Sequence, residues 1–81
     1  MLDFLADCNR DELTCHVRIA ATTLAIQLSP ARRSLCLPDW TTETQALAIR
    51  RWIGDRPHTY ELDAEGVIVD AHFALWPCRP N

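Results

Sequence analysis

The chain has 81 residues, a formal net charge of −3 and a hydrophobic content of 48%. These proportions are typical of a soluble globular domain, and they exclude an intrinsically disordered chain. The length suits a single domain over residues 1–81 and excludes the large nucleotide-binding and barrel enzyme folds. A net negative charge is atypical of proteins that coat nucleic acid or bind anionic membrane surfaces.

The N-terminal segment and the cysteines bear on the cellular compartment. Residues 1–7 carry two acidic side chains where a signal peptide needs positive charge. The longest uncharged stretch, residues 19–31, is shorter than the roughly 20 apolar residues of a membrane span. We therefore predict a cytoplasmic protein without a membrane partner. Its cysteines are expected to be reduced there, whereas export would allow two disulfides among Cys8, Cys15, Cys36 and Cys78.

The first third of the chain allows two interpretations. Residues 2–8 predict a short helix. From residue 13 to residue 28 apolar and polar residues alternate, and the phase of the alternation changes at Ala21 and Thr22. This pattern favours a hairpin of two strands with apolar pairs facing each other, followed by a third short strand over residues 34–37.

A helix over residues 10–28 is the alternative, because a turn at Ala21 and Thr22 lacks the Gly or Asn that tight hairpins prefer. The spacing from Asn9 to Glu12 also fits a capping box. Such a helix would have apolar residues on two opposite sides. One side would carry Leu13, Val17, Ala20, Ala21, Leu24 and Leu28, and the other would carry Cys15, Ile19 and Ile26.

Residues 42–53 have the sequence features of a helix. Thr42 and Gln45 fit a capping box, and Glu43 lies in the first turn, where the helix dipole favours an acidic side chain. Gly54 is a suitable C-terminal cap. One apolar face carries Ala46, Ala48, Ile49, Trp52 and Ile53.

The C-terminal region predicts a second hairpin. Residues 63–66 end in Gly and resemble a turn, and residues 67–75 alternate between two rows, of which one is entirely apolar. Together these elements predict an α+β fold, in which a small antiparallel sheet of four to five strands packs against the helix over residues 42–53. A helical first half followed by the same helix and hairpin is the alternative.

Motifs for metal binding and catalysis are missing from the sequence. There is no Cys-x-x-Cys pair of the kind that holds structural zinc. Gly54 and Gly66 are the only glycines, so a Gly-rich phosphate loop is excluded. A cysteine and a histidine could pair as nucleophile and base, but four cysteines and three histidines offer such pairs by chance. We predict no enzyme, no metal and no cofactor.

Binding to one protein partner is the function that the remaining residues favour. Trp76 is predicted on the outward face of the last strand, on the side of Asp70 and His72. Aromatic and arginine side chains on an exposed face are typical of interface hot spots. The predicted contact residues are Arg50, Arg51, Tyr60, Asp70, His72 and Trp76. An exposed sheet face could also support a homodimer.

A small nucleic-acid-associated regulator is the alternative function. It would use two arginine pairs, Arg32 with Arg33 and Arg50 with Arg51, if the fold brings them together. The acidic net charge weighs against it. In its small size and lack of catalytic motifs, the chain is similar in kind to accessory proteins of bacteriophages and mobile elements. This similarity implies an inhibitor or adaptor that modulates a host machine by binding it.

Overall fold

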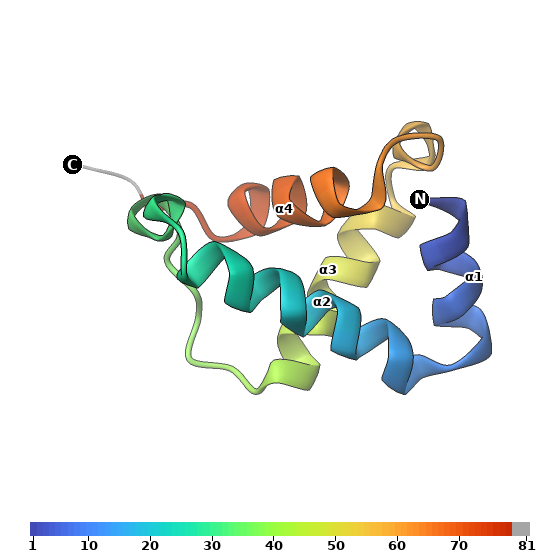
Figure 1. Cartoon of the computed structure of the whole chain (residues 1–81), viewed down its shortest axis with the longest axis horizontal. Coiled ribbons are helices and arrows are strands. Elements are labelled where there is room, and N and C mark those ends of the chain that lie inside the picture. Colours follow the sequence, from blue (N-terminus) through green and yellow to red (C-terminus); the bar gives the residue numbers. More distant parts are fainter. Residues whose placement is uncertain (79–81) are drawn as a thin grey trace.

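The computed structural model describes residues 1–78, and within this range the regular structure is entirely helical (Figure 1). The α-helices are α1 (Leu2–Arg10), α2 (Glu12–Gln27), α3 (Thr42–Gly54) and α4 (Ala64–Leu75), and the 3-10 helices are η1 (Pro30–Ser34) and η2 (Pro57–Thr59). The predicted α+β fold is therefore wrong. The predicted helices over residues 2–8 and 42–53 are confirmed as α1 and α3.

The four helices enclose one small core. α2 contacts α1, α3 and α4, and α3 also packs on α4. Figure 1 shows α4 running beside α2, while α3 crosses behind α2. α1 lies at the opposite end of the molecule from η1. The largest fully buried side chains come from all four helices and are Phe4, Cys15, Ile19, Ile49, Ile53, Ile68 and His72.

α2 replaces the predicted N-terminal hairpin. Asp11 caps it, because its carboxylate accepts hydrogen bonds from the Leu13 amide at 3.1 Å and the Thr14 hydroxyl at 2.7 Å. The alternative interpretation, a helix in this region, is thus confirmed. The alternation was misleading because α2 is apolar on two opposite sides. Residues two positions apart then lie on opposite sides of the helix and are both apolar, as they would be on one face of a strand.

α4 replaces the predicted C-terminal hairpin. The supposed turn at residues 63–66 is the first turn of a helix, since the Asp63 carboxylate accepts a hydrogen bond from the Gly66 amide at 3.2 Å. The buried positions follow the helical spacing and are Val67, Ile68, Ala71 and His72. Core packing of this face outweighs the strand preference of its β-branched residues.

The predicted third strand over residues 34–37 is also wrong. Leu35 forms only an isolated antiparallel bridge with Pro77. Two backbone hydrogen bonds flank this bridge: the Cys36 amide donates to the Trp76 carbonyl, and the Cys78 amide donates to the Ser34 carbonyl, each at 2.9 Å. The bridge holds the connection between η1 and α3 against the segment that follows α4.

Both pairs of cysteines form disulfides, so the prediction of reduced thiols is wrong. Cys8–Cys15 joins α1 to α2, and Cys36–Cys78 joins the connection before α3 to the segment after α4. Within residues 1–78 no cysteine remains as a free thiol, which removes cysteine as a nucleophile or metal ligand there. None of the described helices is both long enough and apolar enough to cross a membrane.

Candidate functional site

The outward side of α2 is the most unusual surface of the molecule. Leu13, Val17, Leu24 and the C-cap residue Leu28 are 72%, 58%, 55% and 77% exposed. Ala20 and Ala21 lie between them on the same side of the helix. We call these six residues the α2 ridge. The core residues of α2, which are Cys15, Ile19 and Ile26, lie on the opposite side.

Exposed leucines are ordinary when they are scattered singly over a surface. On the α2 ridge, however, residues recur at intervals of three and four and form one continuous line along the helix. A small monomer that leaves such a line in water forgoes the free energy of burying it. A continuous exposed apolar surface of this kind is typical of an interaction site.

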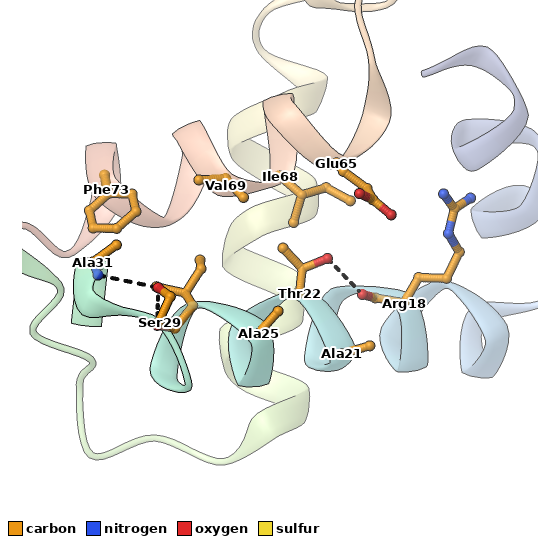
Figure 2. A pocket seen from close by; sticks show the side chains of 11 residues that line it. Arg18, Ala21, Thr22, Ala25, Ser29, Ala31, Glu65, Ile68, Val69 and Phe73 are labelled. Atoms are coloured by element: carbon orange, nitrogen blue, oxygen red, sulfur yellow. Dashed lines mark hydrogen bonds between the residues drawn. The ribbon is translucent and has the colours of Figure 1, made fainter.

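A groove of about 470 Å³ runs beside the ridge, between α2 and α4 (Figure 2). The small side chains of Ala21 and Ala25 on α2 leave it open, and Val69 and Phe73 on α4 form its other wall. The buried residue Ile68 contributes to its lining. Because Ala21 belongs to both features, the groove and the α2 ridge form one continuous apolar surface.

One end of the groove is charged. Figure 2 shows Arg18 of α2 and Glu65 of α4 at the same end. The Arg18 guanidinium lies 5.1 Å from the centre of the Phe4 ring and 3.7 Å from a carboxylate oxygen of Asp7. These contacts hold the Arg18 side chain at the mouth of the groove, where it could orient a polar group of a bound molecule.

A cluster of Glu12, His16 and Glu43 has the composition of a metal site, with its ligand atoms within 4.8 Å of one another. Arg50 already supplies a positive charge to it. The nearest Arg50 nitrogen lies 3.4 Å from a Glu12 oxygen and 3.4 Å from Nε2 of His16. Arg50 and Glu12 thus form an ion pair between α3 and α2 within this cluster, and we assign no metal to it.

His72 is fully buried on α4, so its prediction as an outward-facing contact is wrong. Its Nδ1 donates to the Ile68 carbonyl at 2.8 Å, which places the ring proton on Nδ1. The Thr23 hydroxyl of α2 lies 2.6 Å from Nε2 and 3.0 Å from the Ile19 carbonyl, so its one proton is shared between these two acceptors. Burial lowers the pKa of His72 below its ordinary value of 6.5. The neutral ring thus acts as a polar link between α4 and α2.

Acid should destabilise the fold through this ring. Because the folded-state pKa of His72 is below 6.5, the unfolded chain binds the proton more readily as the pH falls below that value. The contribution of this group to the free energy of unfolding should be constant well above pH 6.5 and should decrease as the pH falls through that value. Urea denaturation between about pH 7.5 and about pH 5, above the range in which carboxylates titrate, measures this loss.

His72→Gln should remove most of this pH dependence, whereas replacement of the exposed His58 by Gln should retain it. An equal pH dependence in both variants would contradict a buried neutral His72.

The remaining predicted contacts are not gathered into one surface. Trp76 is buried and packs edge-on against Trp40, with ring centres 6.0 Å apart; its predicted outward orientation is wrong. Tyr60 is half-buried, and its hydroxyl donates to the Gly54 carbonyl at 3.3 Å. Arg51 and Asp70 are exposed, on α3 and α4 respectively.

Sequence reasoning did not select the α2 ridge as a binding surface. A signal for it was nevertheless present, since the helical alternative places all six ridge residues on one side of the helix. What the pattern did not determine is which of the two apolar sides faces the core.

Comparison of the chain with protein-family models, with curated proteins and with solved structures gives no significant match. The function is therefore inferred from the chemistry and geometry of the described residues.

Proposed function

We propose that this protein is a small non-enzymatic binding module, an inhibitor or adaptor that acts on one protein partner through the α2 ridge. The observation that carries the proposal is the continuous line of large aliphatic side chains, each more than half exposed, on the side of α2 opposite the core. Burial of such a surface by a partner is favourable.

The shape of this surface favours a helical partner. The distance from Leu13 to Leu28 corresponds to about 22 Å of helix, given a rise of about 1.5 Å per residue. An amphipathic helix of about four turns would match this length, with apolar side chains in the adjoining groove. Arg18 and Glu65 at the end of the groove would then select polar groups at one end of the partner helix.

The alternative, a nucleic-acid-associated regulator, needs the two arginine pairs in one basic patch. Arg32 and Arg33 lie in η1, at one end of the molecule, whereas Arg50 and Arg51 lie in the C-terminal half of α3 (Figure 1). Arg50 is also paired with Glu12. This separation weakens the case for phosphate binding, and we do not adopt it.

The two disulfides bear on where the protein works. Disulfides persist in oxidising compartments and are rare in the cytosol. A chain whose cysteines pair twice across separate elements is better suited to an oxidising environment than to the predicted cytoplasm. We therefore favour a partner that is met outside the reducing cytosol.

Replacing Leu24 by Gln should abolish partner capture while leaving the protein folded. The side chain is 55% exposed, and Gln is a good helix former of similar length, so the substitution removes apolar contact area without disturbing α2. The measurement is affinity capture from extracts of the source organism with wild type and variant as bait, with and without nuclease and at two salt concentrations.

Leu62→Gln is the matched control, because Leu62 is 53% exposed and lies outside the α2 ridge. It should capture the same protein as wild type. Equal loss in both variants would contradict a role for the ridge. Capture that disappears with nuclease or moderate salt would instead support the nucleic-acid alternative.

A further inference from the structure

We propose that a second copy of this chain covers the α2 ridge, with the two α2 helices antiparallel and related by a two-fold axis that passes beside Ala20 and Ala21. This inference concerns the same surface as the proposed function and rests on it. In the free protein, self-pairing would then occupy the surface that the partner uses.

The spacing of the ridge residues carries the inference. The ridge is symmetric about the Ala20–Ala21 peptide bond: Leu13 and Leu28 are equally far from it, and so are Val17 and Leu24. An antiparallel copy centred there therefore places Leu13 opposite the second Leu28 and Val17 opposite the second Leu24. Every large apolar side chain of the ridge meets another, as a two-fold interface requires.

The centre of the ridge also suits a helix crossing. Ala20 of one copy would face Ala21 of the other, and these are the smallest side chains on this side of α2. Small residues allow two helix axes to approach closely, so the larger side chains on either side can interdigitate. A partner of unrelated sequence would not need this symmetric distribution of small and large residues.

Charge favours the same arrangement. Glu43 lies at the Leu13 end of the ridge, where it lines one hollow with Leu13 and Val17. Arg32 and Arg33 follow Leu28 at the other end, and within residues 1–78 neither forms an ion pair. Antiparallel pairing brings the basic end of one copy to the acidic end of the other, twice per dimer.

These charges also lie on the matching flank of the helix. Glu43 lines one hollow with His16 and Ala20, on one flank of the ridge, and Arg32 borders Gln27 and Leu37. A further hollow is lined by Ala20, Gln27, Leu37 and Thr42. Glu43 and Arg32 therefore both lie on the flank of α2 that faces the start of α3. A two-fold axis perpendicular to both helices places the C-terminal end of one α2 beside the N-terminal end of the other. It also leaves this flank of both helices on the same side of the dimer, so Arg32 of one copy approaches Glu43 of the other.

Sedimentation equilibrium of the intact, disulfide-bonded chain tests the proposal. Wild type should convert from monomer to dimer between low micromolar and millimolar concentration. Leu24→Gln should raise the dimer dissociation constant at least about tenfold, because each substitution acts twice at a two-fold interface. Leu62→Gln should leave it unchanged. A wild type that stays monomeric at millimolar concentration would overturn the proposal.

A charge exchange tests the orientation of the two helices. Glu43→Arg should weaken the dimer, and the addition of Arg32→Glu in the same chain should restore it, since each copy then presents the opposite charges. Glu61→Arg, an exposed acidic position on the loop before α4, is the control for net charge. Failure of the second substitution to restore dimerisation would overturn the antiparallel arrangement.

Nuclear Overhauser effects between isotope-labelled and unlabelled copies give the register directly. Leu13 methyl groups should contact Leu28 of the other copy, and intermolecular contacts confined to other surfaces would overturn the proposal. The two proposals can fail separately. A monomer whose partner capture still depends on Leu24 refutes self-pairing alone, whereas a dimer that captures no protein by this ridge refutes the binding-module proposal alone.

Discussion

Replacing Cys36 and Cys78 together by serine is expected to lower the free energy of unfolding by about 4 kcal/mol. This disulfide joins residues 42 positions apart, and the closed loop contains all of α3 and α4. A cross-link of that span removes much conformational freedom from the unfolded chain. Total stability for a domain of this size is about 4–12 kcal/mol, so the loss is large enough to unfold a marginal protein.

The local structure around Cys36 and Cys78 strengthens this expectation. Apart from the disulfide, the connection before α3 is tied to the segment after α4 by the Leu35–Pro77 bridge and its two backbone hydrogen bonds. A single bridge is too short to be stable by itself. Without the disulfide, both segments should separate and expose Trp76.

Urea denaturation followed by circular dichroism measures the effect. The matched control is the double serine variant of Cys8 and Cys15, a pair only 7 positions apart, which should lose about 2.5 kcal/mol by the same loop-closure reasoning. Equal losses in the two double variants, or no loss for the Cys36 and Cys78 variant, would contradict the assigned connectivity.

Ile19→Ala is expected to lower the free energy of unfolding by about 3 kcal/mol, whereas Leu24→Ala should change it by less than about 0.5 kcal/mol. The two residues belong to the same helix, but Ile19 is 2% exposed and Leu24 is 55% exposed. Truncation of Ile19 leaves a cavity in the core between the helices. Truncation of Leu24 shortens a side chain that is already more than half exposed to water.

This pair of variants tests which side of α2 faces the core. The measurement is again urea denaturation, in dilute protein so that association through the ridge makes no contribution. A larger loss for Leu24→Ala than for Ile19→Ala would show that α2 is rotated and that the supposed ridge is the core.

Capping residues were the most useful sequence signal for the helix α3. α3 was predicted from Thr42 and Gln45 at its start and from Gly54 at its end. In the structure the N-cap is Thr41, whose hydroxyl accepts from the Thr44 amide at 3.1 Å, and Gly54 is the last helical residue. α4 has a comparable cap at Asp63, but the same residue also suits a hairpin turn. Local sequence alone does not separate these two uses.

Hydrophobic periodicity failed where a helix has apolar residues on more than one side. In α2, Cys15 and Ile19 form the inner side while Leu13 and Val17 form the outer side, so every second residue of this stretch is apolar. The error and the candidate function have the same origin. The strand-like alternation arises because the exposed residues of the ridge alternate along the sequence with the buried residues of the inner side.

The disulfides and the role of His72 were beyond sequence reasoning for a different reason. Four cysteines allow three pairings, and their spacing does not choose among them. The environment of His72 depends on Thr23 of another helix, which is a contact between residues 49 positions apart. Such contacts follow from the packing of the helices and cannot be derived from a local pattern.

Site-specific photo-crosslinking in cells of the source organism tests the role of the α2 ridge most directly. A photo-reactive benzoylphenylalanine is placed at the position of Leu24 or, as a control, of Leu62, since both side chains are about equally exposed. The proposed function predicts that light joins position 24 to a partner protein other than this chain and leaves position 62 largely without adducts, whereas an adduct to a second copy alone would support only the dimer. Adducts at position 62 as abundant as those at position 24, or none at position 24, would contradict the proposed function.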